Sequence, residues 1–153
     1  MERTFVIVKP SAVNRQLIGE VISRFERKGL RLAAMKMTKL SDEILAEHYS
    51  HLVDKPFFPK LRASMQETPV VICCWEGVDA VNVVRVMCGV TNSRNADAGT
   101  IIGDLSMSMQ QNIVHSSDSL ENAKIELNRF FKSEDYFTYT RIVDAAIYAS
   151  DEI

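Results

Sequence analysis

The alternation of hydrophobic and polar positions predicts a chain of strands and helices in turn. Residues 4–8 form a continuous apolar run rich in β-branched side chains, as in a central strand that is covered on both faces. Apolar residues then recur on one helical face: Ile18, Val21, Ile22 and Phe25. Gly29 ends this helix, because glycine readily adopts the left-handed conformation found at helix C-termini.

The next segments predict a strand and two helices. Residues 31–40 alternate partially, so they indicate a strand with three side chains on one face: Ala33, Met35 and Met37. Ser41 can cap a helix that continues to Tyr49. Prolines within residues 55–59 interrupt the helical pattern, because each proline biases its predecessor away from helix. A short helix then reaches Met65.

A third strand, a helix and a long loop follow. Residues 70–75 are apolar throughout, as in a strand buried on both faces, and residues 77–87 have the pattern of a helix. This helix carries three apolar side chains on one side: Val81, Val84 and Cys88. Periodicity is lost in residues 89–111, a segment that is too long for a passive connection. We therefore expect residues 89–111 to be a binding loop.

The last elements complete a recognisable fold class. Residues 112–115 indicate a fourth strand, and Asp118 with Glu121 has the spacing of a capping box at a helix start. The apolar stripe of that helix is Leu120, Ala123, Leu127 and Phe130. The order favours one α/β (α+β) domain over residues 1–153, a ferredoxin-like sandwich whose four-stranded antiparallel sheet is covered by helices. A doubly wound parallel sheet would need more strands.

Composition adds that the chain is an ordinary globular protein, with 46% hydrophobic and 25% charged residues. No apolar run is long enough to span a bilayer, and the first residues lack signal-peptide features. We therefore expect no membrane association and a reducing, cytoplasmic location. The cysteines suit buried thiols, because they are odd in number and two are adjacent in an apolar run: Cys73, Cys74 and Cys88.

The formal net charge of −2 argues against a nonspecific nucleic-acid binder, which normally carries a basic excess. A mildly acidic protein can still bind a polyanion if its positive charge is concentrated in one pocket. The charge balance therefore indicates a small anionic ligand.

The histidines offer two kinds of chemistry. His48 and His51 are spaced i, i+3 on a predicted helix, but no third ligand has suitable spacing and surface histidines are common, so we expect no metal site. His115 ends a strand before the polar residues 116–119 and precedes a helix, where an imidazole is a good nucleophile toward phosphate. From spacing alone, a strand-end histidine hydrogen-bonded to Ser117 is the more frequent arrangement.

The sequence has no glycine-rich phosphate signature, so any nucleotide site must rely on side chains. The candidates are Lys9, Arg85, Thr91 and Arg94, each of which singly is more often a solvated surface group. Phe57, between two prolines, could stack on a base or fill the core.

Residues 112–119 resemble the N-x-x-H-x-S-D-S active-site signature of nucleoside diphosphate kinases. The similarity continues, in order and at family spacing, through residues 3–10, 24–29, 48–49, 56–59, 75–77, 85–87, 89–92 and 99–104. The resemblance implies the ferredoxin-like fold. It also implies transfer of the γ-phosphate of a nucleoside triphosphate, typically ATP, to a nucleoside diphosphate.

The resemblance also implies roles for single residues. His115 would take the phosphate and hand it on by a ping-pong mechanism, oriented by Ser117 and Glu126, with Lys9 in the same catalytic group. The implied nucleotide contacts are Lys9, Tyr49, Arg85, Thr91 and Asn112 near the phosphates and sugar, and Phe57, Leu61 and Met109 near the base. Stacking tolerates every base, because every base has a π-face. Mg²⁺ is the implied cofactor, held mainly by the nucleotide phosphates rather than by a protein metal site.

Several positions depart from the family pattern. Ile102 replaces a usual arginine that contacts the phosphates, so a charge-assisted contact worth about 1.5–3 kcal/mol is missing and weakened activity is expected. Arg94 could substitute for it. Ser116 replaces a usual glycine, Arg129 a usual tryptophan, and Ser93 a common proline, which should loosen the loop.

The resemblance also bears on assembly. Residues 132–153 track the longer, eukaryote-like members, whose C-terminal tails pack against neighbouring subunits. This implies a homohexamer rather than the tetramer of shorter bacterial forms. Two other hypotheses are a catalytically impaired nucleotide-binding scaffold of the same fold and a single-stranded nucleic-acid binder. The acidic charge and the lack of an aromatic pair on a predicted sheet face count against nucleic acid.

Overall fold

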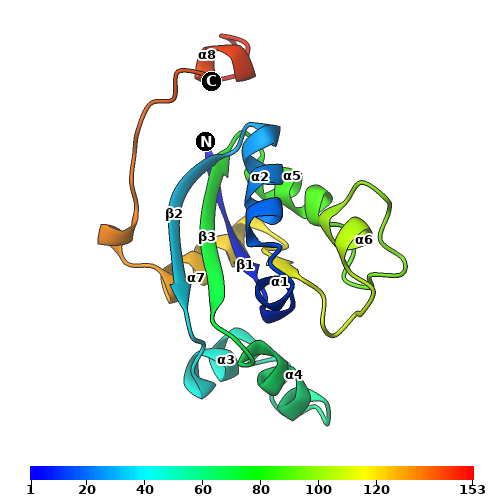
Figure 1. Cartoon of the computed structure of the whole chain (residues 1–153). Helices are drawn as coiled ribbons and strands as arrows, with labels where there is room; N and C mark the ends of the chain where they lie inside the picture. Colours follow the sequence, from blue (N-terminus) through cyan, green and yellow to red (C-terminus); the bar gives the residue numbers. More distant parts are fainter.

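The computed structural model describes residues 1–153. Its middle layer is a four-stranded sheet in the order β2-β3-β1-β4, and every neighbouring pair of strands is antiparallel (Figure 1). The strands are β1 (Glu2–Val8), β2 (Arg31–Thr38), β3 (Val70–Gly77) and β4 (Val114–Ser116). This strand order, with helices in the connections, is the ferredoxin-like arrangement that the sequence predicts.

Helices α1 to α7 cover the sheet, and α8 lies apart on the C-terminal segment (Figure 1). The helices are α1 (Pro10–Asn14), α2 (Ile18–Lys28), α3 (Asp42–His48), α4 (Phe58–Met65), α5 (Ala80–Cys88), α6 (Ile101–Leu105), α7 (Leu120–Phe130) and α8 (Asp144–Ile147), with a 3-10 turn η1 (Ser133–Asp135) between the last two. No helix has both the length and the apolar character that a membrane crossing requires. Two predicted helix ends are confirmed: the Ser41 side chain accepts a hydrogen bond from the Ile44 amide, and Gly29 ends α2 with φ 104°.

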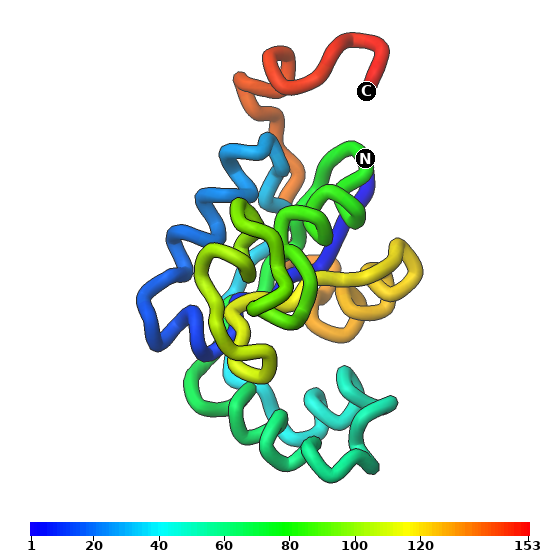
Figure 2. The backbone as a smooth tube through the Cα atoms, turned by 90° about the vertical axis from the view of Figure 1, so that its right-hand side faces the viewer, coloured from blue at the N-terminus to red at the C-terminus, as the bar shows by residue number.

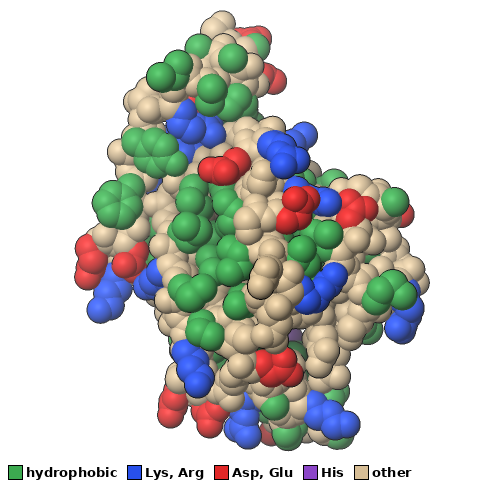
Figure 3. Space-filling model, in the orientation of Figure 1, with side chains coloured by type: hydrophobic (Ala, Val, Ile, Leu, Met, Phe, Trp, Pro, Cys, Tyr) green, Lys and Arg blue, Asp and Glu red, His purple; other side chains and the backbone are tan.

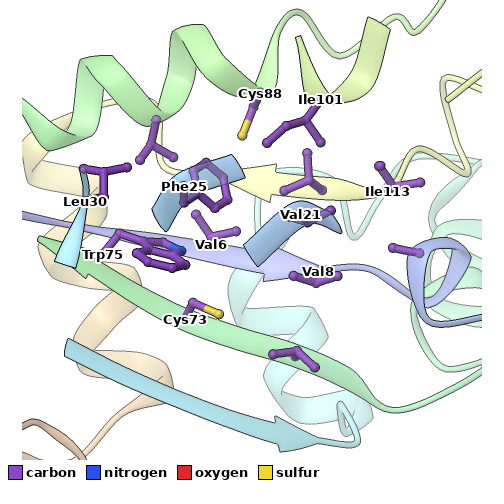
Figure 4. Packing of buried hydrophobic residues seen from close by; sticks show 14 of the residues in the cluster. Val6, Val8, Val21, Phe25, Leu30, Cys73, Trp75, Cys88, Ile101 and Ile113 are labelled. Atoms are coloured by element: carbon purple, nitrogen blue, oxygen red, sulfur yellow. The ribbon is translucent and has the colours of Figure 1, made fainter. Parts of the chain in front are cut away.

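One face of the sheet packs against α1, α2, α5 and α6. Val6 and Val8 of β1 point into this side, where the Phe25 ring lies 5.2 Å from that of Trp75 (Figure 4). The other face carries Phe5 and packs against α3, α4 and α7, and Phe5 stacks on Phe130 at 4.6 Å. Adjacent strand residues therefore enter different cores, as alternation in a strand requires. The three cysteines are buried free thiols, as expected.

Several predicted boundaries are wrong. The fourth strand is Val114–Ser116 rather than residues 112–115, so His115 lies within the strand. The loop of residues 89–111 contains the helix α6, which has no amphipathic period because it is only five residues long. Ser119, not Asp118 with Glu121, caps α7 by accepting a hydrogen bond from the Asn122 amide. The helix expected over residues 77–87 begins only at Ala80.

The second strand also differs from its prediction. Ala33 is buried, but Met35 and Met37 are exposed, because the register with β3 shifts between Leu32 and Ala34. The strand lies at the edge of the sheet, and neither methionine packs against the core on either face. The irregularity is a β-bulge, which changes the face that the following residues present.

The C-terminal segment runs over the outside of the domain and ends near the N-terminus (Figure 2). The Arg141 guanidinium donates to the carbonyl oxygens of Gly29 and Leu30 at 3.0 and 2.9 Å. The Tyr148 hydroxyl accepts a 3.3 Å hydrogen bond from the Val78 amide. Between these contacts several apolar side chains face solvent, among them a completely exposed Ile142. Figure 3 shows hydrophobic side chains exposed along this C-terminal segment.

Candidate active site

The middle residue of β4 is His115, which pairs with Ile7 of β1. Residues that pair across two strands point to the same face, so His115 shares the face of Ile7 and Phe5. Its ring centroid lies 6.1 Å from that of Phe5. Helix α7 covers this face, and β4 is an edge strand, so the imidazole lies beside α7 while one side of it stays open.

Glu126 of α7 holds this imidazole. Its Oε2 lies 2.6 Å from His115 Nε2, and its Oε1 accepts a 2.6 Å hydrogen bond from the Ser117 hydroxyl. Ser117 therefore orients the carboxylate and reaches the histidine only through it, unlike the direct contact considered from the sequence. Burial alone raises the pKa of Glu126, but the hydrogen bonds from His115 and Ser117 outweigh it, and this pKa lies below its ordinary value.

The arrangement determines which imidazole nitrogen can react. An ionised carboxylate only accepts hydrogen bonds, so the contact with Glu126 places the proton of neutral His115 on Nε2. Nδ1 then keeps its lone pair. A histidine held in this way is a nucleophile with a defined direction.

Positive and polar side chains gather next to His115. The pocket is lined by Lys9, Arg85, Cys88, Gly89, Thr91, Ile102, Asn112, Val114, His115 and Ser116. Lys9 Nζ donates to Asn112 Oδ1 at 2.7 Å, and the Asn112 amide donates to the Thr91 carbonyl at 3.2 Å. Arg85 donates to the Ser116 carbonyl at 3.1 Å. Four of the residues expected at the phosphates are thus brought together with the histidine.

Lys9 is the most unusual of these groups. Burial lowers the pKa of its ammonium group to about 8. No carboxylate lines the pocket to pair with it. A partly buried cation without an anionic partner loses hydration without compensation, and a bound anion would offset that cost. The charge balance of this pocket therefore favours a negatively charged group such as phosphate.

The departures from the family pattern are also visible here. Ile102 lines the pocket with 3% of its surface exposed and packs into the core. Arg94 is exposed, does not line this pocket and makes no side-chain hydrogen bond or ion pair. Ser93 is buried and donates to the Ser108 carbonyl at 2.7 Å, so it ties the loop together at a point where we expected loosening.

The residues expected around a base lie outside this pocket. Phe57, just before α4, and Met109 are 48% and 54% exposed. Leu61 of α4 and Tyr49 at the end of α3 pack partly against the core under α3, α4 and α7. Burial, with a smaller contribution from the charge of Glu126, raises the pKa of Tyr49 to about 12, so its hydroxyl stays protonated.

His48 is the residue that sequence reasoning misjudged. It is buried rather than at the surface, its ring lies 4.9 Å from that of His115, and its Nδ1 lies 3.6 Å from Glu126 Oε2. His51, its expected companion, is exposed. No spacing rule would have found this cluster, because the two histidines are 67 positions apart in the chain.

The ligand atoms of His48, His115 and Glu126 lie within 4.8 Å of one another, close enough to surround a metal ion. However, His115 Nε2 and Glu126 Oε2 already bind each other, and Arg129 Nη1 lies 3.1 Å from His48 Nδ1. The cluster is therefore occupied by its own hydrogen bonds.

Comparisons with known proteins match this geometry. A family model described as nucleoside diphosphate kinase matches residues 2–136. A nucleoside diphosphate kinase of Parabacteroides distasonis is 59% identical and covers 99% of both chains. Nucleoside diphosphate kinase B of Bos taurus is 48% identical over 90% of this chain and 91% of its own. The solved structure of a halophilic nucleoside diphosphate kinase from Halobacterium salinarum in complex with CDP has a TM-score of 0.93 at 37% identity, covering 97% of this chain and 99% of that one.

Proposed function

This chain belongs to the nucleoside diphosphate kinase family, and from that premise we propose that its phosphate transfer proceeds through Nδ1 of His115. The enzyme is a phosphotransferase that moves the γ-phosphate of a nucleoside triphosphate to a nucleoside diphosphate. The comparisons do not favour the alternative of an impaired scaffold. The 2.6 Å contact between His115 Nε2 and Glu126 is the observation that supports the proposed route.

The first half-reaction forms a P–N bond and breaks a P–O bond. The lone pair on His115 Nδ1 attacks the γ-phosphorus, and the nucleoside diphosphate leaves with the electrons of the broken bond. The imidazole becomes positively charged in this step, and the Glu126 carboxylate stabilises that charge through the proton on Nε2. In the second half-reaction, a terminal oxygen of another diphosphate attacks the same phosphorus and restores the imidazole.

The pocket cations would bind the phosphates during both steps. Lys9 is partly buried beside His115, so a phosphate oxygen would supply the negative partner that its ammonium group lacks. Arg85 donates one hydrogen bond to the Ser116 carbonyl, and its other N–H groups remain available to a phosphate. Thr91 and Asn112 offer neutral polar groups. Ile102 can supply neither charge nor a hydrogen bond, so we infer a rate below that of a pocket with arginine in its place.

The base would lie outside this pocket, between apolar side chains. Phe57 exposes its ring at the start of α4, with Leu61 one turn further along, and Met109 is exposed on the loop before β4. Tyr49 lies at the end of α3, where its protonated hydroxyl can donate a hydrogen bond to the nucleotide. Contacts of this kind would bind every base, since they do not depend on base-edge hydrogen bonds.

Mg²⁺ suits this site only as a partner of the nucleotide. The pocket offers cations, amides and hydroxyls but no carboxylate, and Mg²⁺ is usually held by carboxylates together with substrate phosphates. We therefore propose that phosphate oxygens hold the ion and that no protein side chain is its ligand. When bound, Mg²⁺ would offset the charge of the phosphates.

We also propose a homohexamer in the cytoplasm. The exposed apolar side chains of the tail over residues 132–153 support contacts with neighbouring subunits: Phe137, Tyr139, Ile142, Val143 and Ile153. The three unpaired, buried cysteines are consistent with a reducing compartment.

The test is labelling of the protein with γ-labelled ATP and magnesium. The wild-type chain should acquire an acid-labile, alkali-stable label that added GDP removes, and His115→Ala should acquire none. The control is His51→Ala, because His51 is exposed and lies outside the site. A protein that binds nucleotide but never acquires label at His115 would refute the proposed route.

A further inference from the structure

Arg129 of α7 lies behind the proposed nucleophile, where the proposed function gives it no role. It follows Glu126 by three positions, on the same side of α7. Its Nε donates to Glu47 Oε1 at 3.0 Å, and its Nη1 lies 3.1 Å from His48 Nδ1. The side chain is 12% exposed, so the guanidinium is clamped between two consecutive residues of α3.

His48 has a choice of tautomer that the surrounding atoms must decide. Burial is the main cause that lowers the pKa of His48 to about 3. The electrostatic effects of His115, Arg129 and Lys9 act in the same direction, and Glu126 opposes them. Its neutral ring therefore carries one proton, on Nδ1 or on Nε2. Nδ1 faces Arg129 and Glu126, whereas Nε2 is buried without any hydrogen-bond partner.

Without Arg129, the surroundings would favour the proton on Nδ1. That tautomer would direct an N–H group toward Glu126 Oε2, which lies 3.6 Å from Nδ1, and would leave no N–H group unpaired at Nε2. Arginine, however, has donors and no acceptor. Its Nη1 can bind His48 Nδ1 only if that nitrogen is unprotonated, so the proton is forced onto Nε2 in spite of the missing partner there.

The tautomer matters because Glu126 Oε2 is the same oxygen that binds His115 Nε2, at 2.6 Å. A proton on His48 Nδ1 would bring a second donor to that oxygen. The two histidines would then compete for one carboxylate oxygen, and His115 would lose part of the interaction that orients its ring and stabilises its positive charge.

We propose that Arg129 is a positioning residue, which keeps His48 in the Nε2–H tautomer and so reserves the Glu126 carboxylate for His115. The inference rests on the proposed role of His115. Arg129 does not line the phosphate pocket, and its side chain makes no hydrogen bond with a residue proposed to bind the base. It should therefore affect the rate of phosphate transfer and leave nucleotide binding unchanged.

The direct test is nitrogen-15 NMR of the histidine side chains in the whole protein. The chain has only three histidines, so their signals can be assigned by single substitutions. In the wild type, His48 should carry its proton on Nε2, and in Arg129→Met the proton should move to Nδ1. Arg129→Lys, which keeps a donor without an acceptor, should retain the Nε2–H form. Glu47→Gln is the matched control, because it removes the salt bridge on Arg129 and leaves the His48 contact.

The kinetic test measures the single-turnover rate of His115 phosphorylation by ATP. Arg129→Met should slow this step by about three- to tenfold, the effect of weakening one hydrogen bond, with KM changed less than about twofold. Arg129→Lys should recover most of the rate. In a His48→Phe background the competing donor is absent, so Arg129→Met should have little further effect.

The NMR test and the kinetic test can each refute the inference separately. A wild-type His48 protonated on Nδ1, or a tautomer that does not respond to Arg129→Met, would refute it even if the His48→Phe protein fails to fold. An equal loss of rate in the presence and absence of His48 would show a merely structural role for Arg129. If the tautomer behaves as expected but His115 never takes up phosphate, the proposed function fails instead, so the two failures are distinguishable.

Discussion

Replacing Glu126 with glutamine tests the central contact of the proposed mechanism. The substitution keeps the shape of the side chain but removes its charge and one of its two acceptor oxygens. In the structure both oxygens are used, each at 2.6 Å, by His115 Nε2 and the Ser117 hydroxyl. A glutamine can accept from only one of them, so one charge-assisted hydrogen bond is lost outright.

The expected size follows from that loss. A hydrogen bond to a charged group contributes about 1.5–3 kcal/mol. Because the charge on His115 develops as the P–N bond forms, the loss falls mainly on the transition state. Phosphorylation of His115 should then be slower by roughly ten- to a hundredfold, at about 1.4 kcal/mol for each factor of ten.

The assay is rapid-quench measurement of His115 phosphorylation with excess ATP. Glu121→Gln is the control, because it removes an exposed carboxylate from the same helix and should leave the rate unchanged. Ser117→Ala, which leaves the charge of Glu126 in place, should cost less than Glu126→Gln. A folded Glu126→Gln protein that phosphorylates within about twofold of the wild-type rate would refute the reasoning, since that difference is far below the expected one.

The same substitution makes a prediction about pH. The pKa of Glu126 in the folded protein lies below its ordinary value, so the ionised carboxylate contributes stability that is present above the pKa of the unfolded chain, about 4.3. This contribution is lost as the pH falls through the lower folded pKa. Acidification below about pH 4 should therefore lower the unfolding free energy of the wild type more than that of Glu126→Gln. Denaturant unfolding at several pH values measures it.

Two further substitutions probe the pocket. Lys9→Met should reduce the rate of phosphate transfer by at least about a hundredfold. It should also stabilise the nucleotide-free protein at pH 7, because burial lowers the pKa of Lys9 from 10.5 to about 8. This stabilisation should become smaller as the pH rises from 8 toward 10.5, because in that range Lys9 is protonated in the unfolded chain but not in the folded protein. A difference in unfolding free energy that does not depend on pH would contradict this. Ile102→Arg should raise kcat/KM by about tenfold and lower the unfolding free energy by about 1–3 kcal/mol, because the side chain is buried. An unchanged rate would mean that another group already supplies the contact.

The elements that were predicted well are those with a strong local signal. The stripe that begins at Ile18 marked α2, the apolar run from Val70 marked β3, and Ser41 marked the start of α3. The boundaries that failed are those where the signal is short or ambiguous. Helix α6 is too short to show a period, and both Asp118 and Ser119 are plausible caps for α7.

Some residues around the proposed site were indicated by the sequence, and others are seen only in the structure. The motif around His115 carried the family resemblance, and the structure brings Lys9, Arg85 and Asn112 to it as expected. Nothing in the spacing indicated that His48 is buried against His115 and Glu126, or that Arg129 reaches back to α3.

The amino-acid order alone was enough to predict the fold class and the family, and it led us to propose His115 as the reactive histidine, because periodicity and motifs are properties of neighbouring residues. Only the folded chain could show which nitrogen of His115 is free, which carboxylate oxygen it depends on and what controls that oxygen. These contacts join β4, α7 and α3, and their distances depend on how the layers pack. The physical reason is that hydrogen bonding is sensitive to tenths of an ångström and to direction, whereas a sequence pattern specifies only which face of an element is buried.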